Sequence, residues 1–177
     1  TRGVPIVKVG VIHPVESFWL HWGPNDKSGL IREELDKNFQ DLTKWLLFGS
    51  IDFDFISESL LPGLCPHADA PLRVGEMKYD VIVVPGCETL RSSTLDRLEK
   101  FREDGGRVIF LGEAPTLEDA QPSDRGERLF KNSEHIPYQR VSLLTALDRS
   151  RTVCIRDDDG YLSDGLIYQL REDTDSL

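Results

Sequence analysis

Three short apolar runs each end in a turn-forming motif, and this pattern constrains the fold more than any other feature of the sequence. The runs cover residues 7–12, 81–84 and 108–111. The motifs that follow them are His13-Pro14, Pro85-Gly86-Cys87-Glu88 and Gly112-Glu113-Ala114-Pro115. Continuous apolar runs of this length are typical of strands buried on both faces of a parallel sheet. Because the loops after the carboxyl ends of such strands form the ligand crevice, we expect the three motifs to share one rim.

Segments with helical periodicity lie between these runs. Apolar residues at steps of three or four predict a long helix over residues 30–48. A second helix is expected between a serine cap, Ser92 or Ser93, and the pair Gly105-Gly106. Shorter elements are also predicted: a helix over residues 141–147, a short helix within 119–132, strands over 51–57, 72–77, 152–155 and 161–172, a turn over 157–160, and loops over 13–26 and 60–71. The alternation of strands and helices predicts the α/β class, with a three-layer, doubly wound and mostly parallel sheet.

Composition and charge exclude several classes of function. The 177 residues carry 31 acidic and 21 basic side chains, a net charge of −10, which disfavours nucleic acid and anionic membrane surfaces as partners. No run of 18 apolar residues occurs, so no membrane-spanning helix is expected, and the first residues lack the apolar core of a signal peptide. We therefore expect a cytoplasmic protein.

The sequence indicates neither a metal site nor a cofactor. The three cysteines, Cys65, Cys87 and Cys154, are far apart and form no CxxC pair, so neither a zinc site nor a disulfide framework is predicted. His13 and His21 have no third donor at metal-ligand spacing. The signatures GxGxxG and GxxxxGK[ST] are absent, which argues against a phosphate-bearing cofactor held by those loops.

Cys87 is the candidate nucleophile. A Gly-Cys pair after a strand can form a nucleophile elbow, in which a following helix and a nearby histidine activate the thiolate. His13 or His67 would serve as the base, and Glu88 or Glu113 would orient it. Because a neighbouring carboxylate such as Glu88 disfavours a thiolate, the pattern favours a structural role for Cys87.

Two carboxylates and an aromatic segment are the other candidates. Glu88 and Glu113 each follow a predicted strand, where a carboxylate can act in acid–base chemistry or bind a sugar hydroxyl. If both pointed into one crevice, they would form a pair of the kind that glycosidases use. Residues 13–22 are unusually aromatic for a loop, and their candidate ligand or interface residues are His13, Glu16, Trp19, His21 and Trp22. Such rings either stack on a ligand, for example a sugar, or dock against a neighbouring domain.

A family resemblance rests on two stretches of the sequence. They are Tyr79-Asp80-Val81-Ile82-Val83-Val84-Pro85-Gly86 and Gly105-Gly106-Arg107-Val108-Ile109-Phe110-Leu111-Gly112, with a capped helix between them. Over roughly residues 7–155 the chain resembles class I glutamine amidotransferase-like domains, which implies a flavodoxin-like fold. More narrowly, it is similar to the version embedded in large bacterial glycoside hydrolases, where the domain follows a catalytic barrel, as in the trimerisation domain of family 42 β-galactosidases.

The same resemblance argues against amidotransferase activity. In true amidotransferases the nucleophilic cysteine follows the strand that residues 107–111 represent, and Gly112-Glu113-Ala114 stands there in this chain. The histidine and glutamate partners of that cysteine also find no match after residue 155. The resemblance therefore implies a non-catalytic accessory domain of a glycoside hydrolase of carbohydrate metabolism. Such a domain would pack on the catalytic barrel or on a neighbouring subunit, with the aromatic segment at the substrate cleft or the interface.

Domain organisation and partners follow from this interpretation. Residues 1–157 would form the amidotransferase-like domain, and residues 158–177 a C-terminal β extension or the start of a following β domain of a longer protein. The expected partners are adjacent domains of the same polypeptide, carbohydrate and further copies of the chain. Two alternatives stay open at this point: a thiol-dependent amidotransferase or hydrolase that uses Cys87, and a flavin- or nucleotide-binding module.

Overall fold

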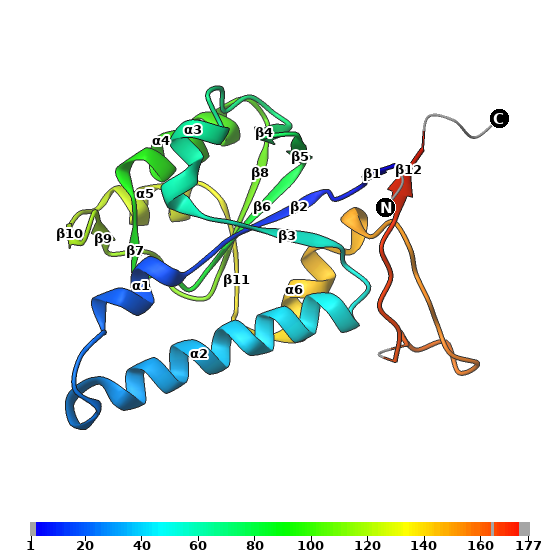
Figure 1. The fold of residues 1–177 in the computed structure, drawn as a ribbon, viewed down its shortest axis with the longest axis horizontal. Helices are drawn as coiled ribbons and strands as arrows, with labels where there is room; N and C mark the ends of the chain where they lie inside the picture. The colour runs from blue at the N-terminus through cyan, green and yellow to red at the C-terminus, as the bar shows by residue number, and fades with distance from the viewer. Residues whose placement is uncertain (1–2, 164, 174–177) are drawn as a thin grey trace.

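A five-stranded parallel sheet forms the centre of the computed structural model, which describes residues 3–163 and 165–173 (Figure 1). Its strands are β2 (Val9–Ile12), β3 (Phe53–Ile56), β6 (Val81–Pro85), β8 (Arg107–Leu111) and β11 (Glu134–Ile136). They lie in the order β11-β8-β6-β2-β3, and each pairs with its neighbours in parallel. Within this sheet, the strand that comes first in the chain (β2) thus lies between the second (β3) and the third (β6), which is the flavodoxin-like order. The predicted fold class is confirmed.

Helices cover both faces of this sheet, as Figure 1 shows. One face carries α2 (Asn25–Phe48) and α6 (Arg140–Ala146), and the other carries α3 (Leu61–Leu64), α4 (Ser92–Glu103) and α5 (Arg125–Lys131). These are the three layers that the alternation of strands and helices predicts.

Two hydrophobic clusters, one on each face, follow from the alternation of side chains along the buried strands. In β6, Val81 and Val83 join the cluster that contains Leu42 and Leu46 of α2. The intervening residues Ile82 and Val84 point the other way and join the cluster beneath α4. Burying one such aliphatic side chain stabilises the fold by roughly 1.5–3 kcal/mol. The apolar runs in the sequence are continuous because helices cover both faces of each strand.

Smaller elements complete the fold. They are β1 (Val4–Pro5), α1 (Val15–Leu20), the 3-10 turn η1 (Glu58–Leu60), the hairpin of β4 (Leu72–Val74) and β5 (Met77–Tyr79), the short strands β7 (Thr89–Leu90), β9 (Leu117–Glu118) and β10 (Gln121–Pro122), the 3-10 turn η2 (Asp148–Ser150) and β12 (Arg171–Glu172). The strands β7, β9 and β10 form a small separate sheet next to the carboxyl end of the central one.

The prediction of a loop over residues 13–26 is wrong, because this segment contains α1 and the first residues of α2. Tertiary hydrogen bonds order the helix α1. The buried hydroxyl of Ser17 accepts hydrogen bonds from the backbone N–H groups of Glu88 (2.9 Å) and Thr89 (3.2 Å). A six-residue helix held in this way is too short to produce a periodic apolar pattern.

The predicted strand over residues 152–155 is also wrong. The fifth strand of the sheet is β11, which precedes α6 rather than following it. β11 lies at the edge of the sheet, and its residues Glu134 and His135 are exposed. Because β11 is a short, polar edge strand, no apolar run marks it in the sequence. The more apolar residues 152–155 therefore match the expected strand pattern better.

The prediction that Ser92 or Ser93 caps α4 is also wrong. Arg91 occupies the N-cap position, and no side chain of the helix caps it. Instead, the Arg91 N–H donates to a carboxylate oxygen of Glu58 (2.8 Å), and the Ser92 N–H donates to Asp119 (3.1 Å). Carboxyl groups from other parts of the chain thus accept hydrogen bonds from the free N–H groups at the start of the helix.

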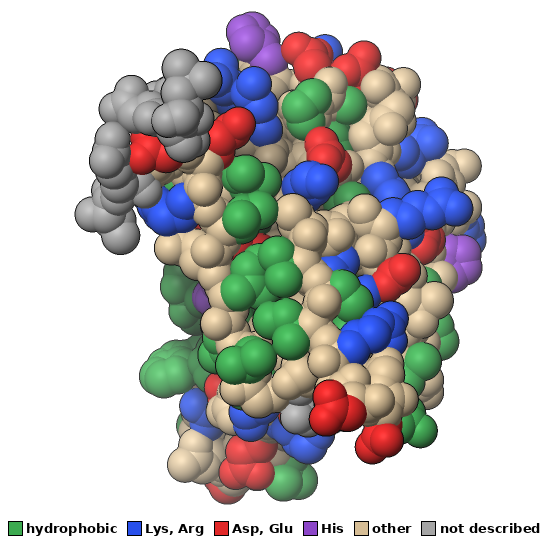
Figure 2. All heavy atoms as spheres, turned by 90° about the vertical axis from the view of Figure 1, so that its right-hand side faces the viewer, with side chains coloured by type: hydrophobic (Ala, Val, Ile, Leu, Met, Phe, Trp, Pro, Cys, Tyr) green, Lys and Arg blue, Asp and Glu red, His purple; other side chains and the backbone are tan. Residues whose placement is uncertain are grey.

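After η2, the described C-terminal segment runs outside the central sheet to the N-terminal strand β1. β12 pairs with β1 in antiparallel register, and Gly160 (φ +86°) forms the predicted turn. Hydrophobic side chains on this face of the molecule lie exposed between charged ones (Figure 2), and the exposed residues of the segment include Tyr161, Leu166 and Ile167. Residue 164 and the last four residues of the predicted β extension lie outside the described part of the chain.

Candidate functional site

A cleft of about 930 Å³ opens at the carboxyl edge of the central sheet. Its lining includes residues from all three predicted motifs, namely His13, Pro14, Pro85, Gly86, Gly112 and Glu113. The prediction that these motifs share one rim is confirmed. The lining is completed by Val15, Phe18, Glu34, Leu35, Asp36, Asn38, Phe39, Phe130, His135, Ile136, Pro137 and Tyr138. The volume lies within the roughly 300–1,000 Å³ of small-ligand pockets.

His13 stands at the end of β2 and is held by aromatic rings. Its imidazole meets Phe39 of α2 edge to face, with ring centroids 5.1 Å apart, and Phe55 of β3 at 5.6 Å. Burial lowers the pKa of His13, because the charged imidazolium would lose its hydration. At neutral pH the side chain is therefore a neutral imidazole, which offers one hydrogen-bond donor and one acceptor.

Tyr138 closes the cleft between β11 and α2. Its ring lies close to two glycines: an ideal Cβ built on Gly86 would be 3.5 Å, and one built on Gly112 3.2 Å, from the nearest ring carbon. Both glycines have positive φ, +42° and +93°. The Tyr138 hydroxyl donates to the backbone carbonyl of Asn38 in α2 at 2.8 Å. The two glycines thus give the chain its turn at each strand end and leave room for the ring.

His135 and Tyr138 are lining residues that the sequence did not indicate. His135 is exposed and stacks on Phe130 of α5, with centroids 4.5 Å apart and planes 26° apart. The signal that identifies them is the parallel pairing of β11 with β8, which carries residues 135–138 past the strand-end motif at Gly112. That pairing is visible only in the structure.

Cys87 does not line the cleft. Its side chain is buried, with 2% of the residue exposed, and the thiol donates to the Pro85 carbonyl at 3.3 Å. Burial, and secondarily the carboxylate of Glu58, raises the pKa of the Cys87 thiol well above its ordinary value. Cys87 is therefore a neutral thiol at physiological pH, which is the opposite of what a nucleophile requires.

The two candidate carboxylates have different surroundings. Glu113 is exposed and lines the cleft. Glu88 lies outside the lining, and a carboxylate oxygen accepts from His21 Nε2 at 2.6 Å. The structure therefore brings only one of the two into the cleft. Glu16 also lies outside it and pairs with Arg91 of the α4 cap at 2.7 Å.

The two tryptophans of the segment project from the surface rather than into the cleft. Trp19 is 56% exposed and Trp22 is 70% exposed. The guanidinium of Arg32 lies 5.2 Å from the centre of the Trp22 ring, a cation–π contact. Phe18, whose ring centroid is 6.1 Å from that of Trp22, connects this surface to the cleft lining.

Two further findings bear on the class of site. Within the described residues, no three His, Cys, Asp or Glu side chains come together in a group that could hold a metal ion. No helix in the part of the chain that the structure describes is long and apolar enough to cross a membrane.

Comparisons with known proteins find partial similarity among solved structures. No protein-family model matches the chain, and no curated protein matches it. Among solved structures, the chain is similar to a cold-adapted β-galactosidase from Rahnella sp. R3, with 22% sequence identity and a TM-score of 0.45. The match covers 67% of this chain and 15% of that enzyme, so this chain corresponds to a small part of the enzyme's length.

Proposed function

We propose that the chain is a non-catalytic accessory domain that packs beside the catalytic part of a glycoside hydrolase. The observation that carries the proposal is the state of Cys87. The residue that would have to act as nucleophile is buried, is neutral at physiological pH and does not line the cleft. In the amidotransferases that this chain resembles, the catalytic cysteine follows the strand that corresponds to β8. This chain has Gly112 and Glu113 there.

The exposed apolar surfaces favour packing against another domain. Trp19, Leu20, Trp22 and Leu30, which we call the aromatic edge, are all exposed at the α1–α2 end of the molecule. Large apolar side chains gathered on a surface mark contact sites for other proteins. Trp is also among the residues most enriched in the centres of such contacts. The aromatic edge is thus our proposed docking surface for the catalytic part of the parent enzyme.

The thiol-dependent alternative lacks the arrangement that it requires. A catalytic thiol needs a base within hydrogen-bond reach, commonly a histidine. The Cys87 thiol donates to the Pro85 carbonyl, whereas His13 packs against two phenylalanine rings. His67 lies in the loop after α3, where its carbonyl accepts from the thiol of Cys65.

A turnover assay on the purified chain tests the proposal. Release of ammonia from glutamine and hydrolysis of aryl glycosides are measured for the native chain, for Cys87→Ser and for Glu113→Gln, with Cys154→Ser as the matched control. We expect no turnover above buffer in any of the four proteins. Turnover that Cys87→Ser abolishes would establish a thiol enzyme, and turnover that Glu113→Gln abolishes would establish a carboxylate-dependent one; either result overturns the proposal.

A further inference from the structure

The cleft at the sheet edge is built for one class of ligand, and this inference goes beyond the accessory role. We propose that it binds a neutral saccharide, with aromatic rings against the sugar faces and the carboxylate of Glu113 accepting from a hydroxyl group.

The lining of the cleft offers an anionic ligand no cationic partner. Three carboxylates line the cleft, those of Glu34, Asp36 and Glu113. The same lining, which consists entirely of described residues, contains no lysine or arginine. Phosphates and carboxylates are held in proteins by Arg, Lys or clustered amide groups. An anion in this cleft would instead meet uncompensated negative charge.

The backbone amides at the strand ends are not available to an anion either. The His13 N–H donates to the Ile56 carbonyl (2.9 Å), the Gly86 N–H to Leu111 (2.8 Å) and the Gly112 N–H to Ile136 (2.9 Å). Flavin- and nucleotide-binding folds of this class hold phosphate with free amides at the same sheet edge. Here these three donors are used within the sheet, so none of them is free to bind a phosphate.

The exposure of the carboxylates favours a neutral ligand over a cationic one. Glu34, Asp36 and Glu113 are all exposed, and water screens their attraction for a cation. Their oxygens can still accept hydrogen bonds from hydroxyl groups, and such charge-assisted bonds are stronger than neutral ones. A neutral ligand that is rich in hydroxyl groups gains from them without depending on a screened charge pair.

Rings and imidazoles supply the remaining contacts of a saccharide. Phe39, Tyr138 and the stacked pair Phe130–His135 stand in the walls. Aromatic side chains offer a flat apolar face that suits the C–H face of a pyranose ring. The neutral imidazole of His13 adds a donor and an acceptor. The flat rings suit the C–H faces of a sugar. Groups that can both donate and accept hydrogen bonds suit the hydroxyl groups at the edges of the sugar.

Amide-shift titrations of the isotope-labelled chain test this inference. The probes are glucose, galactose and mannose as neutral sugars, glucosamine as a cationic sugar and glucuronate as an anionic one. We expect at least one neutral hexose to shift the amide signals of Gly86, Gly112 and Glu113, and glucuronate to leave them unchanged. Glu113→Gln should weaken the binding about tenfold, as expected for a hydrogen bond to a charged group. The matched control is Glu76→Gln, because Glu76 is exposed in the β4–β5 turn outside the cleft.

Four outcomes would overturn the inference. Glucosamine binding more than about tenfold tighter than every neutral hexose would make the cleft a cation site. Tighter binding of glucuronate would make it an anion site. Absence of shifts at the cleft with all five sugars, or equal weakening by Glu113→Gln and Glu76→Gln, would leave no saccharide site there. None of these results affects the accessory role, which the turnover assay tests separately.

Discussion

The hydroxyl of Tyr138 donates to the backbone carbonyl of Asn38 across 2.8 Å, although 100 residues separate the two in the chain. This bond ties the segment after β11 to the middle of α2. It fixes the width of the cleft at the point where the ring lies over the ends of β6 and β8. The shape of the cleft therefore depends on the two strand-end glycines that face this ring.

Gly112→Ala should destabilise the fold and disturb the cleft. The residue has φ +93°, and an added Cβ would lie 3.2 Å from a ring carbon of Tyr138. The backbone conformation alone costs about 1–2 kcal/mol for a non-glycine residue, and displacement of the ring adds to it. Gly105→Ala is the matched control, because Gly105 has φ +89° with no atom within 4 Å of the added Cβ. Urea unfolding should show the larger loss at Gly112; an equal or smaller loss there would mean that the ring is not tightly seated.

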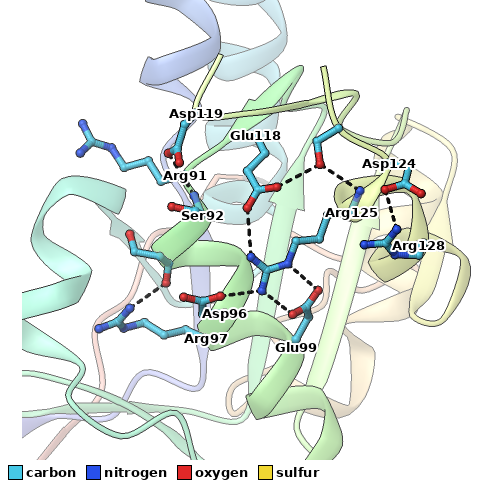
Figure 3. Close-up of polar contacts among 12 residues, drawn as sticks. Arg91, Ser92, Asp96, Arg97, Glu99, Glu118, Asp119, Asp124, Arg125 and Arg128 are labelled. Atoms are coloured by element: carbon cyan, nitrogen blue, oxygen red, sulfur yellow. Dashed lines mark hydrogen bonds and ion pairs between the residues drawn. The ribbon is translucent and has the colours of Figure 1, made fainter. Parts of the chain in front are cut away.

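Arg125 joins three elements through three carboxylates, and its loss should destabilise the fold. Its guanidinium contacts Asp96 (2.5 Å) and Glu99 (2.6 Å) of α4 and Glu118 (3.0 Å) of β9 (Figure 3). Arg125→Met would leave these carboxylates close together without a cation. Because the side chain is 21% exposed, we expect a loss of about 2 kcal/mol, between the values for surface and buried pairs.

Arg128→Met is the control for the Arg125 substitution. Arg128 pairs with Asp124 at 2.5 Å, but both side chains are largely exposed. Removal of that pair should cost less than about 0.5 kcal/mol. Thermal unfolding at low and high salt should show a larger effect at Arg125, which salt reduces. Equal effects of the two substitutions would mean that the network around Arg125 adds nothing to an ordinary surface pair.

Glu58 should make the stability of the fold depend on pH. Burial raises the pKa of Glu58 above its ordinary value of 4.5, and the negative charge of Glu16 raises it further. The folded state therefore binds the proton more tightly than the unfolded state. The free energy of unfolding should fall as the pH rises from 4.5 through the folded-state pKa.

Glu58→Gln should remove this contribution, because the amide stays neutral and keeps an oxygen for the Arg91 N–H. The variant should gain stability relative to the native chain as the pH rises, and urea unfolding at several pH values measures the difference. Glu103→Gln, at an exposed position of α4, should show no such trend. A Glu58→Gln variant that loses stability at pH 7 would show that the ionised carboxylate is needed at the α4 N-terminus.

The sequence predicts the rim of the cleft better than its walls. His13, Gly86, Gly112 and Glu113 follow buried strands whose apolar runs are unmistakable, so their common position follows from the class of sheet. His135 and Tyr138 follow a short polar edge strand, and their position depends on a pairing that no local pattern encodes.

The surroundings of Cys87 show a second limit of sequence reasoning. A thiol after a strand-end glycine can point outward as a nucleophile or inward as part of the core. The choice depends on how the chain turns at Gly86 and on how α1 packs over the turn through Ser17. These are tertiary contacts between residues about 70 positions apart, which explains why the sequence favours a structural role for Cys87 without ruling out a nucleophile.

The most direct test of the account is the alkylation rate of the three cysteines as a function of pH, measured by mass spectrometry of the native chain. Cys154 is exposed, whereas Cys65 and Cys87 are buried with raised pKa values. We expect iodoacetamide to modify the exposed Cys154 and to modify Cys87 far more slowly from pH 6 to pH 9. Modification of Cys87 near pH 6 at a rate above that of Cys154 would reveal an activated thiolate and contradict the non-catalytic role.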